Sequence, residues 1–195
     1  MYNANHIKTI VLIALSFPLL IYPHSLKAAH AYSDSNTIAL TECHLTLLND
    51  TSYFPAILDM IDSAQSEIVM SFFLFKTNGF RNSYPDKFLQ HLIKAAKRGV
   101  MVTVILEREK GSRSTLNKNN RATAQRLRQG GIHVCFDSAF TTTHTKVIVI
   151  DKRYTCLGSH NLTNSALKYN HELSVLIDSP LMAEKTLHYI KSLYK

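Results

Sequence analysis

Three segments of this chain are too apolar on both sides to lie at a protein surface. Residues 67–75 read EIVMSFFLF, residues 100–107 read VMVTVILE, and residues 145–151 read TKVIVID. A β-strand that is apolar on both faces has to be covered on both faces. We therefore expect these segments to be inner strands of a sheet that lies between layers of helices.

Segments with helical periodicity alternate with these strands. In residues 53–65, for example, Ile57, Ile61 and Ala64 fall on one helical face. Further helices are expected at residues 85–99 and 121–131, and from Ser179 and Pro180 onwards.

The remaining segments complete the sheet. We expect residues 108–120 to form a polar loop, and further strands at residues 43–48, 132–137, 154–159 and 171–178. The short spacing between Asp151 and Tyr154 indicates a hairpin, so part of the pairing should be antiparallel. The predicted fold class is α/β, with a mixed β-sheet flanked by helices on both faces.

The N-terminus has the order of a secretory signal peptide. Lys8 precedes an apolar run at residues 9–22, and Ala29, His30 and Ala31 form a small-x-small pattern. The run is short for a membrane-spanning helix, which needs about 20 residues. We expect export to the periplasm or the medium, with a membrane anchor at residues 9–22 as the alternative. The predicted regions are a signal peptide at residues 1–31, a leader at 32–42 and a folded domain at 43–195.

The charge balance favours a polyanionic partner. The chain carries a net charge of +8, and removal of the signal peptide takes away Lys8 and Lys27 and no acid, which leaves +6. Nucleic acid and an anionic membrane surface both suit a basic exported domain, and charge does not choose between them. Many exported domains are also simply basic.

Three cysteines remain after processing: Cys43, Cys135 and Cys156. Their spacing matches no zinc pattern, and an oxidising compartment would allow one disulfide with one thiol left over. We expect them to be small buried hydrophobic residues.

Polar residues surround the apolar strand in residues 144–161, HTKVIVIDKRYTCLGSHN. Side chains alternate along a strand, so His144 and Lys146 face the same way. A histidine can act as a nucleophile or a general acid, and a lysine presents a compact positive charge. Ser159 and Asn161 add polar groups at the end of the next strand. Together these residues predict a pocket for a tetrahedral oxyanion, which means phosphate chemistry.

The segments HTKVIVID and GSHN resemble the HKD signature of the phospholipase D superfamily. Residues 144–177, HTKVIVIDKRYTCLGSHNLTNSALKYNHELSVLI, are similar to the single-motif periplasmic endonucleases of that superfamily. The resemblance covers residues 43–195, with the motif region the most specific. It implies the phospholipase D/nuclease fold with one HKD motif per chain, and a catalytic role for the folded domain.

The resemblance also implies roles for individual residues. His144 would be the nucleophile and form a phosphohistidine intermediate. Lys146 and Asn161 would bind the non-bridging phosphate oxygens, and Ser159 would assist phosphate placement. Glu172, in the segment NHEL, would hydrogen-bond the imidazole and fix its tautomer. No metal or other cofactor is implied, because lysine and asparagine stabilise the charge.

Two motif residues have less certain tasks. Asp151 belongs to the signature and is counted among the catalytic residues, although its place at the far end of the strand indicates a structural role. His160 occupies the variable position of GSHN and is a candidate for substrate contact. Alone, each would be an ordinary turn or structural residue.

A basic segment at residues 108–128 is the candidate substrate surface. It follows a strand end, where clefts of α/β proteins lie, and Glu109 is its only acid. Its first basic residues, Arg108, Lys110 and Arg113, are expected to contact a nucleic-acid backbone. A solvated basic helix face is the plain alternative.

One motif cannot supply the whole reaction. One histidine has to attack phosphorus while another protonates the leaving oxygen. Residues 32–195 contain no second His-x-Lys. Single-motif members of the family dimerise, so we expect a homodimer in which the second His144 is the general acid.

Three functions remain open. The leading hypothesis is a metal-independent phosphodiesterase that acts as a non-specific endonuclease on DNA, with RNA as a further substrate. The alternative is a phospholipase D that hydrolyses phospholipid headgroups. A catalytically silent nucleic-acid or membrane-binding homologue is the third, and the intact motif residues argue against it.

Overall fold

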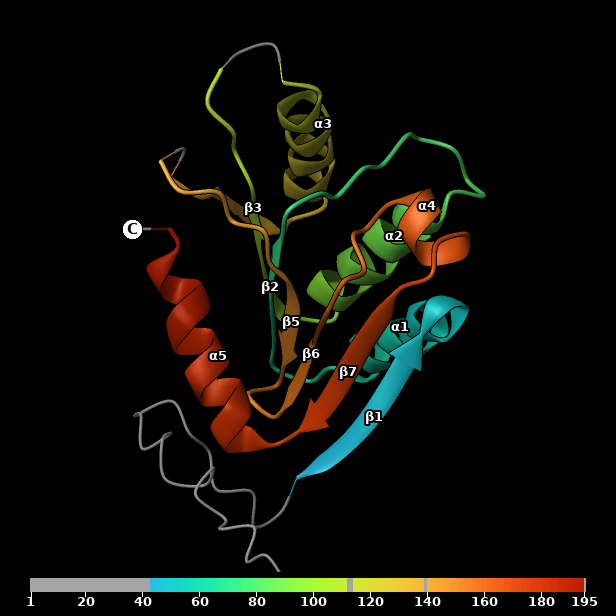
Figure 1. Cartoon of the computed structure of the whole chain (residues 1–195), viewed down its shortest axis with the longest axis vertical. Helices are drawn as coiled ribbons and strands as arrows, with labels where there is room; N and C mark the ends of the chain where they lie inside the picture. Colours follow the sequence, from blue (N-terminus) through green and yellow to red (C-terminus); the bar gives the residue numbers. More distant parts are fainter. Residues whose placement is uncertain (1–42, 112–113, 139, 195) are drawn as a thin grey trace, which may run out of the picture. The chain divides into compact units, whose positions relative to one another are not determined.

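The computed structural model describes residues 43–111, 114–138 and 140–194. Within these residues one seven-stranded sheet has the order β1-β7-β6-β5-β2-β3-β4 (Figure 1). The strands are β1 (His44–Asn49), β2 (Glu67–Phe72), β3 (Met101–Leu106), β4 (His133–Phe136), β5 (Lys146–Ile150), β6 (Tyr154–Gly158) and β7 (Leu173–Asp178). The helices are η2 (Asp50–Ser52), α1 (Tyr53–Ser63), α2 (Tyr84–Lys97), α3 (Thr115–Gln129), α4 (Asn164–Lys168) and α5 (Pro180–Ser192).

The sheet is mixed, as predicted. Strand β2 pairs with β3 in parallel and with β5 antiparallel, so the direction of pairing changes at β2. Strands β3 and β4 are parallel, whereas β5, β6, β7 and β1 pair antiparallel in turn. The α/β fold with a mixed sheet is therefore confirmed.

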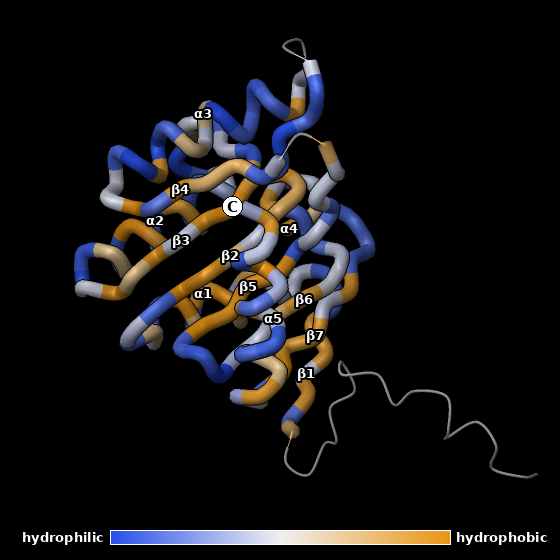
Figure 2. The backbone as a smooth tube through the Cα atoms, turned by 90° about the vertical axis from the view of Figure 1, so that its left-hand side faces the viewer, coloured by the Kyte–Doolittle hydropathy of each residue, from blue (hydrophilic) through white to orange (hydrophobic). Residues whose placement is uncertain are grey.

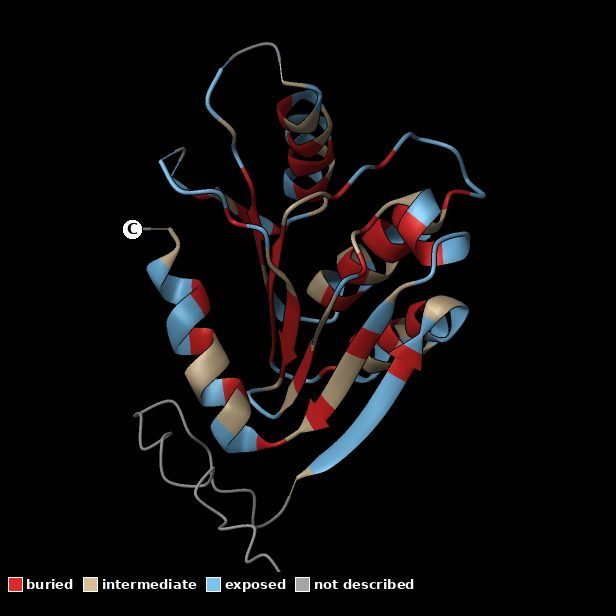
Figure 3. Cartoon of the chain, in the orientation of Figure 1, coloured by how far each residue is buried: buried red, intermediate tan, exposed pale blue. Residues whose placement is uncertain are grey.

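Each face of the sheet has its own apolar layer. Ile68 and Met70 of β2 belong to the larger core, which also contains the buried faces of α1 and α2. Val69 points the other way and packs with Ala183 and Leu187 of α5. Figure 3 shows β2 and β5 buried in the middle, and Figure 2 shows their apolar character. The alternation of side chains along a strand thus places helices on both faces, as expected.

Local signals set the start of α5. The Ser179 hydroxyl accepts a hydrogen bond from the backbone N–H of Met182 at 3.3 Å, which caps the first turn. Pro180 is the first helical residue, where its missing N–H costs nothing. The predicted start of this helix is confirmed.

The prediction of a loop over residues 108–120 is wrong in its second half, because α3 begins at Thr115. The Ser114 hydroxyl caps the helix by accepting the N–H of Asn117 at 3.1 Å. Asn120 is fully buried, and its amide donates to the carbonyls of Phe73 and Glu107 at 2.9 and 3.0 Å. Polar residues that suggested a loop therefore face inward and bond to other segments.

The predicted signal peptide, anchor and leader, residues 1–42, lie outside the described residues. In the part of the chain that the structure describes, no helix has the length and apolar character needed to cross a bilayer. Cys43, Cys135 and Cys156 are all free thiols, and only Cys156 is fully buried. Burial raises the pKa of Cys156 to about 12.

Candidate active site

His144 lies immediately before β5, at the end of the sheet where β2 and β3 finish. Lys146 of β5 is the register partner of Phe72, the last residue of β2. One residue further on, the N–H of Phe73 donates to the carbonyl of Thr145 at 2.9 Å. The hydroxyls of Ser71 and Thr145 are also bonded, at 2.7 Å. The backbone on the C-terminal side of His144 is therefore fixed to β2.

The backbone on the other side of His144 is held by a buried acid. The N–H of Thr143 donates to the carboxyl group of Glu107 at 2.5 Å, and Glu107 is only 1% exposed. His144 itself is exposed. The histidine is thus carried on a segment that is anchored on both sides, while its ring stays open to solvent.

Glu107 shares its buried position with a second carboxyl group. Asp137, at the end of β4, is 2% exposed and accepts the N–H of Arg108 at 2.8 Å. Burial raises the pKa of Glu107 to about 7, and the hydrogen bond with Asp137 and the negative charges of Asp137 and Glu109 act in the same direction. A protonated Glu107 can thus donate to Asp137 while it accepts from Thr143.

Lys146 lies against the ring of His144. Its ammonium nitrogen is 3.2 Å from Nδ1, 3.3 Å from Nε2 and 2.9 Å from the His144 carbonyl oxygen. The ring of Phe73 supports both side chains, at 4.5 Å between ring centroids for His144 and 5.2 Å from the lysine nitrogen. Partial burial lowers the pKa of Lys146, and the charge of Glu172 opposes that shift. A cation and an imidazole therefore share one face, as their spacing predicted.

Glu172 faces this cation from the start of β7. It accepts the hydroxyl of Ser159 on one oxygen and the Nδ2 of Asn170, at 3.1 Å, on the other. The expected hydrogen bond between Glu172 and His144 is not formed among the described residues. Instead, the two oxygens of Glu172 are already bonded to neighbours on the β6–β7 side of the site.

Asp50 holds Glu172 in place from a distant part of the chain. Its carboxylate accepts the N–H of Glu172 at 2.9 Å, and its own N–H donates to the Glu172 carbonyl at 2.9 Å. The bond from the Glu172 N–H, followed by that from His171, lowers the pKa of Asp50. Asp50 has a φ of 46°, which is unusual outside glycine. No pattern in the sequence predicts this contact.

Gly158 explains the glycine of the GSHN segment. A Cβ at this position would lie 2.4 Å from the Cα of Ser174 and 2.5 Å from the carbonyl oxygen of Leu173. Glycine lets β6 approach β7 closely, so that Ser159 can accept the N–H of Leu173 at 3.0 Å. The Ser159 hydroxyl is thereby oriented toward Glu172.

Asn161 lies at the same end of the sheet as His144, because the next residue, Leu162, is bonded to the segment that follows β2. The N–H of Leu162 donates to the carbonyl of Leu74 at 3.0 Å, directly after Phe73. The amide oxygen of Asn161 is buried and has no hydrogen-bond partner among the described residues. The described part of the fold therefore leaves this amide oxygen unpaired, whereas the Ser159 hydroxyl is bonded to Glu172 and Leu173.

Asp151 lies at the other end of β5, away from His144, so the structure replaces its catalytic assignment with a structural one. Its carboxylate accepts the N–H groups of Gln65, Ser66 and Glu67 at 2.8, 2.7 and 3.0 Å. Burial alone would raise the pKa of Asp151, but these bonds lower it. The residue ties the β5–β6 turn to the start of β2.

His160 is also corrected, because its ring is turned into the protein and is 0% exposed. The ring stacks on Tyr53 at 4.1 Å and bonds to the Ser174 hydroxyl at 2.8 Å. Its Nε2 lies 3.1 Å from the carbonyl oxygen of Asp50. Burial lowers the pKa of His160. No ring nitrogen is left for a substrate.

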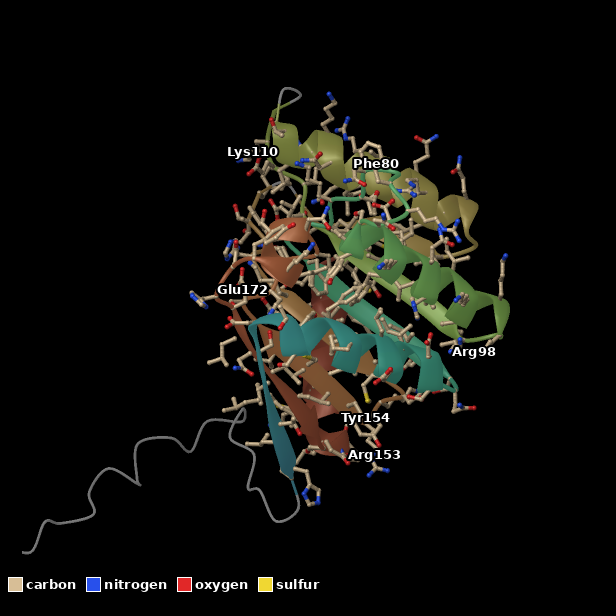
Figure 4. The ribbon with its side chains drawn as sticks, turned by 90° about the vertical axis from the view of Figure 1, so that its right-hand side faces the viewer. Phe80, Arg98, Lys110, Arg153, Tyr154 and Glu172 are labelled. Carbon is tan, nitrogen blue, oxygen red and sulfur yellow. The ribbon has the colours of Figure 1, made fainter. Side chains whose placement is uncertain are left out.

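The predicted basic contacts lie on the β3–α3 connection. Arg108 and Lys110 are exposed, and Lys110 lies 5.2 Å from the ring of Phe140. Arg113 lies outside the described residues. In Figure 4, Glu172 and Lys110 lie toward one end of the strands and Arg153 toward the other. Within the described residues, no group of three or more His, Cys, Asp or Glu side chains could hold a metal ion.

Comparison with known proteins identifies relatives. Residues 57–194 match the family model described as cardiolipin synthase, phospholipase D-like domain. Phospholipase D of Rickettsia prowazekii is 40% identical over 96 residues, which is 49% of this chain and 44% of that protein. Phospholipase D of Rickettsia bellii is 33% identical over 131 residues, or 67% of this chain and 58% of that protein. The match thus spans about half the length of these curated relatives.

A solved structure shares the fold. The phospholipase D family member Nuc from Salmonella typhimurium superimposes with a TM-score of 0.65 at 28% identity. The alignment covers 78% of this chain and 94% of Nuc.

Proposed function

The chain belongs to the family of phospholipase D-like domains, and we propose that it is a metal-independent phosphodiesterase that cleaves nucleic acid as a non-specific endonuclease. The observation that carries the proposal is the exposed His144 ring beside the Lys146 ammonium, 3.2 Å from Nδ1. A nucleophile and a cation on an anchored backbone suit an attack on a phosphodiester.

The reaction has two displacement steps. In the first, a ring nitrogen of His144 bonds to phosphorus as the bond from phosphorus to the leaving oxygen breaks. A second histidine donates its proton to that oxygen. In the second step, water attacks the phosphohistidine, the same second histidine accepts a proton from the water, and the phosphorus–nitrogen bond breaks. Both histidines return to their starting states.

The other site residues stabilise the charge on the phosphoryl group. Lys146 and the amide of Asn161 bind the non-bridging oxygens as negative charge develops. Glu172, held by Ser159 and Asp50, supplies a carboxylate next to the lysine and keeps the ammonium directed into the site.

The second histidine comes from a second copy of the chain. A two-fold axis brings the same residue of each subunit together, so that the two His144 rings face each other across one phosphate. Sedimentation of the active enzyme should show a dimer. Full activity in a sample that contains only monomer would contradict the shared site.

The charge of the protein supports nucleic acid as the substrate, and it suits an anionic lipid surface equally well. The chain has a net charge of +8, and Arg108 and Lys110 are exposed on the connection that follows β3. A phospholipid diester is the second candidate, because the Rickettsia relatives bear the name phospholipase D. The catalytic steps would be the same for both.

The substrates can be separated in one experiment. The purified protein is given plasmid DNA, a single-stranded oligonucleotide, and vesicles of phosphatidylcholine and phosphatidylglycerol, each with and without EDTA. His144→Ala should lower DNA cleavage by more than about 10³-fold. His188→Ala, which removes an exposed histidine from α5, is the matched control and should keep full activity.

Each other result has a defined meaning. Release of headgroups without cleavage of DNA would replace the nuclease with a phospholipase D. Inactivity toward every substrate would favour a binding protein that has lost catalysis. Inhibition by EDTA would contradict the metal-independent mechanism.

A further inference from the structure

We propose that a surface outside the catalytic residues binds unpaired bases of the nucleic acid, so that the enzyme prefers single-stranded substrate. This surface, called here the aromatic rim, comprises Phe80, Tyr84, Tyr169 and Lys168. It rests on the proposed function, because it binds the same strand that the active site cleaves.

Two large aromatic side chains of the aromatic rim face solvent. Phe80 is 72% exposed and Tyr169 is 71% exposed. Both line one hollow of about 270 Å³, together with Tyr84 and Lys168. Isolated exposed aromatic residues are common, but two that line one hollow beside a lysine form a surface for stacking.

The loop that carries Phe80 is held in one conformation. The N–H of Phe80 donates to the Asn78 side chain at 3.0 Å, and its carbonyl accepts the N–H of Ser83 at 2.9 Å. The buried carboxylate of Asp86 accepts the N–H groups of Asn78 and Gly79, both at 3.0 Å. Exposure of the Phe80 ring is therefore imposed by the backbone and is not the result of a loose loop. Because the backbone is already fixed, only the side-chain rotamer of Phe80 has to be ordered when a base stacks on the ring.

The opposite side of the hollow, which carries Tyr84 and Lys168, is also held by specific contacts. Tyr84 stacks on Phe54 at 4.4 Å, and its N–H donates to the Asn164 side chain at 2.9 Å. The Lys168 ammonium lies 5.8 Å from the Tyr84 ring and 5.1 Å from the Tyr169 ring. This lysine places a positive charge between the two rings, where a phosphate would follow a stacked base.

Basic side chains line a second hollow that also includes Phe80. This second hollow has a volume of about 590 Å³, and its cations are Arg81, Lys87, Lys94 and Arg126. Its one carboxylate, Asp86, is already bonded to Arg126 and to the loop backbone. The two hollows thus present positive charge on either side of an exposed ring, which complements a polyanion that carries flat bases.

The aromatic rim adjoins the active site through the chain itself. Asn170 follows Tyr169 directly, and its side chain donates to Glu172 at 3.1 Å. A strand whose phosphate lies at His144 can continue over Tyr169 toward Phe80. Bases in a duplex are paired and stacked on one another, so only an unpaired strand can place a base on these rings.

The polar lining favours nucleic acid over a membrane. Aromatic and lysine side chains also occur where proteins meet a lipid headgroup layer. Here, however, the hollow is lined by the amides of Asn78, Asn82 and Asn164. Amides suit the edges and the sugar of a nucleotide better than acyl chains.

Binding is tested in the full chain carrying His144→Ala, so that the substrate is not consumed. Fluorescence anisotropy measures Kd for a single-stranded 12-mer, the same sequence as a duplex, and a 12-mer of abasic nucleotides. Phe80→Ala and Tyr169→Ala should each weaken binding of the single strand by about 5- to 100-fold. Neither should change binding of the abasic strand or the duplex by more than about twofold, since these offer no free base to stack. Tyr189→Ala removes an exposed tyrosine from α5 and should leave all three constants unchanged.

Hydrolysis of a small diester and binding of phosphatidylglycerol vesicles are measured as well, to keep this inference separate from the proposed function. With His144 intact, Phe80→Ala and Tyr169→Ala should hydrolyse a small chromogenic phosphodiester at the unmodified rate. If the unmodified protein does not hydrolyse the chromogenic diester, the proposed function is overturned. Base-dependent binding would still establish the aromatic rim. Equal affinities of the variants and the unmodified protein for the single strand would overturn the rim. So would an equal loss for the abasic strand, or a loss confined to binding of phosphatidylglycerol vesicles.

Discussion

The buried pair of Glu107 and Asp137 predicts that the protein loses stability as the pH rises toward 8. Burial and the neighbouring Asp137 raise the pKa of Glu107 from 4.5 to about 7. The folded protein therefore keeps a proton at pH 6 that the unfolded chain has released. Stability from this proton is fully present below pH 4.5 and is lost as the pH rises through 7.

The size of the effect follows from the shift. Each pKa unit corresponds to about 1.36 kcal/mol, so Glu107 accounts for a loss of about 3 kcal/mol in the free energy of unfolding. Glu107→Gln removes the titration and keeps the geometry. The amide oxygen can accept the N–H of Thr143, and the amide nitrogen can donate to Asp137 as the protonated Glu107 does.

Urea denaturation at pH 5, 6, 7 and 8, at constant ionic strength, measures the difference. Relative to the unmodified protein, Glu107→Gln should gain about 2–3 kcal/mol between pH 5 and pH 8. Glu184→Gln, which changes an exposed acid on α5, should follow the unmodified protein throughout. Parallel curves for Glu107→Gln and the unmodified protein would refute the protonated state of the buried pair.

Three further substitutions test the framework of the site. Asp151→Asn weakens the bonds to the start of β2 and should cost about 1–3 kcal/mol at pH 7 by urea denaturation. Because the pKa of Asp151 is lowered, this difference should shrink as the pH falls below 3.8, and a constant difference would contradict the account. Gly158→Ala places a Cβ 2.4 Å from the Cα of Ser174 and should cost about 1–3 kcal/mol, whereas unchanged stability would show that β6 and β7 can separate freely. Asn120→Ala leaves buried backbone groups of β2 and β3 without partners, so the thermal midpoint should fall by several degrees, and no fall would mean that water replaces the amide.

Local patterns carried most of the fold. Alternation along β5 separates Ile148 and Ile150, which lie in the larger core, from Val147 and Val149, which pack on the α5 side of the sheet. The same alternation put His144 and Lys146 on one side, where the structure finds them in contact. Such signals lie within a few residues of one another and need no knowledge of the sheet order.

Contacts between distant segments could not be read in this way. Glu107 bonds to the backbone of Thr143 and Asp50 bonds to the backbone of Glu172, and no spacing in the sequence marks either acid. His160 looked accessible because its neighbours in the chain are site residues. Its ring stacks on Tyr53, which is distant in the chain and next to it only in the fold. The start of α3 was missed because the partners of Asn120 lie on other segments.

The contact between Asp50 and Glu172 means that the candidate site is completed late in the synthesis of the chain. These residues are 122 positions apart, and β1, which leads into Asp50, has β7 as its single partner among the described strands. Strand β1, the first of the described strands, can therefore pair only after β7 has been synthesised. A growing chain already carries His144 and Lys146 before Glu172 exists and before Asp50 can hold it. The candidate site is therefore complete only after β7 has been synthesised, whichever phosphodiester it acts on.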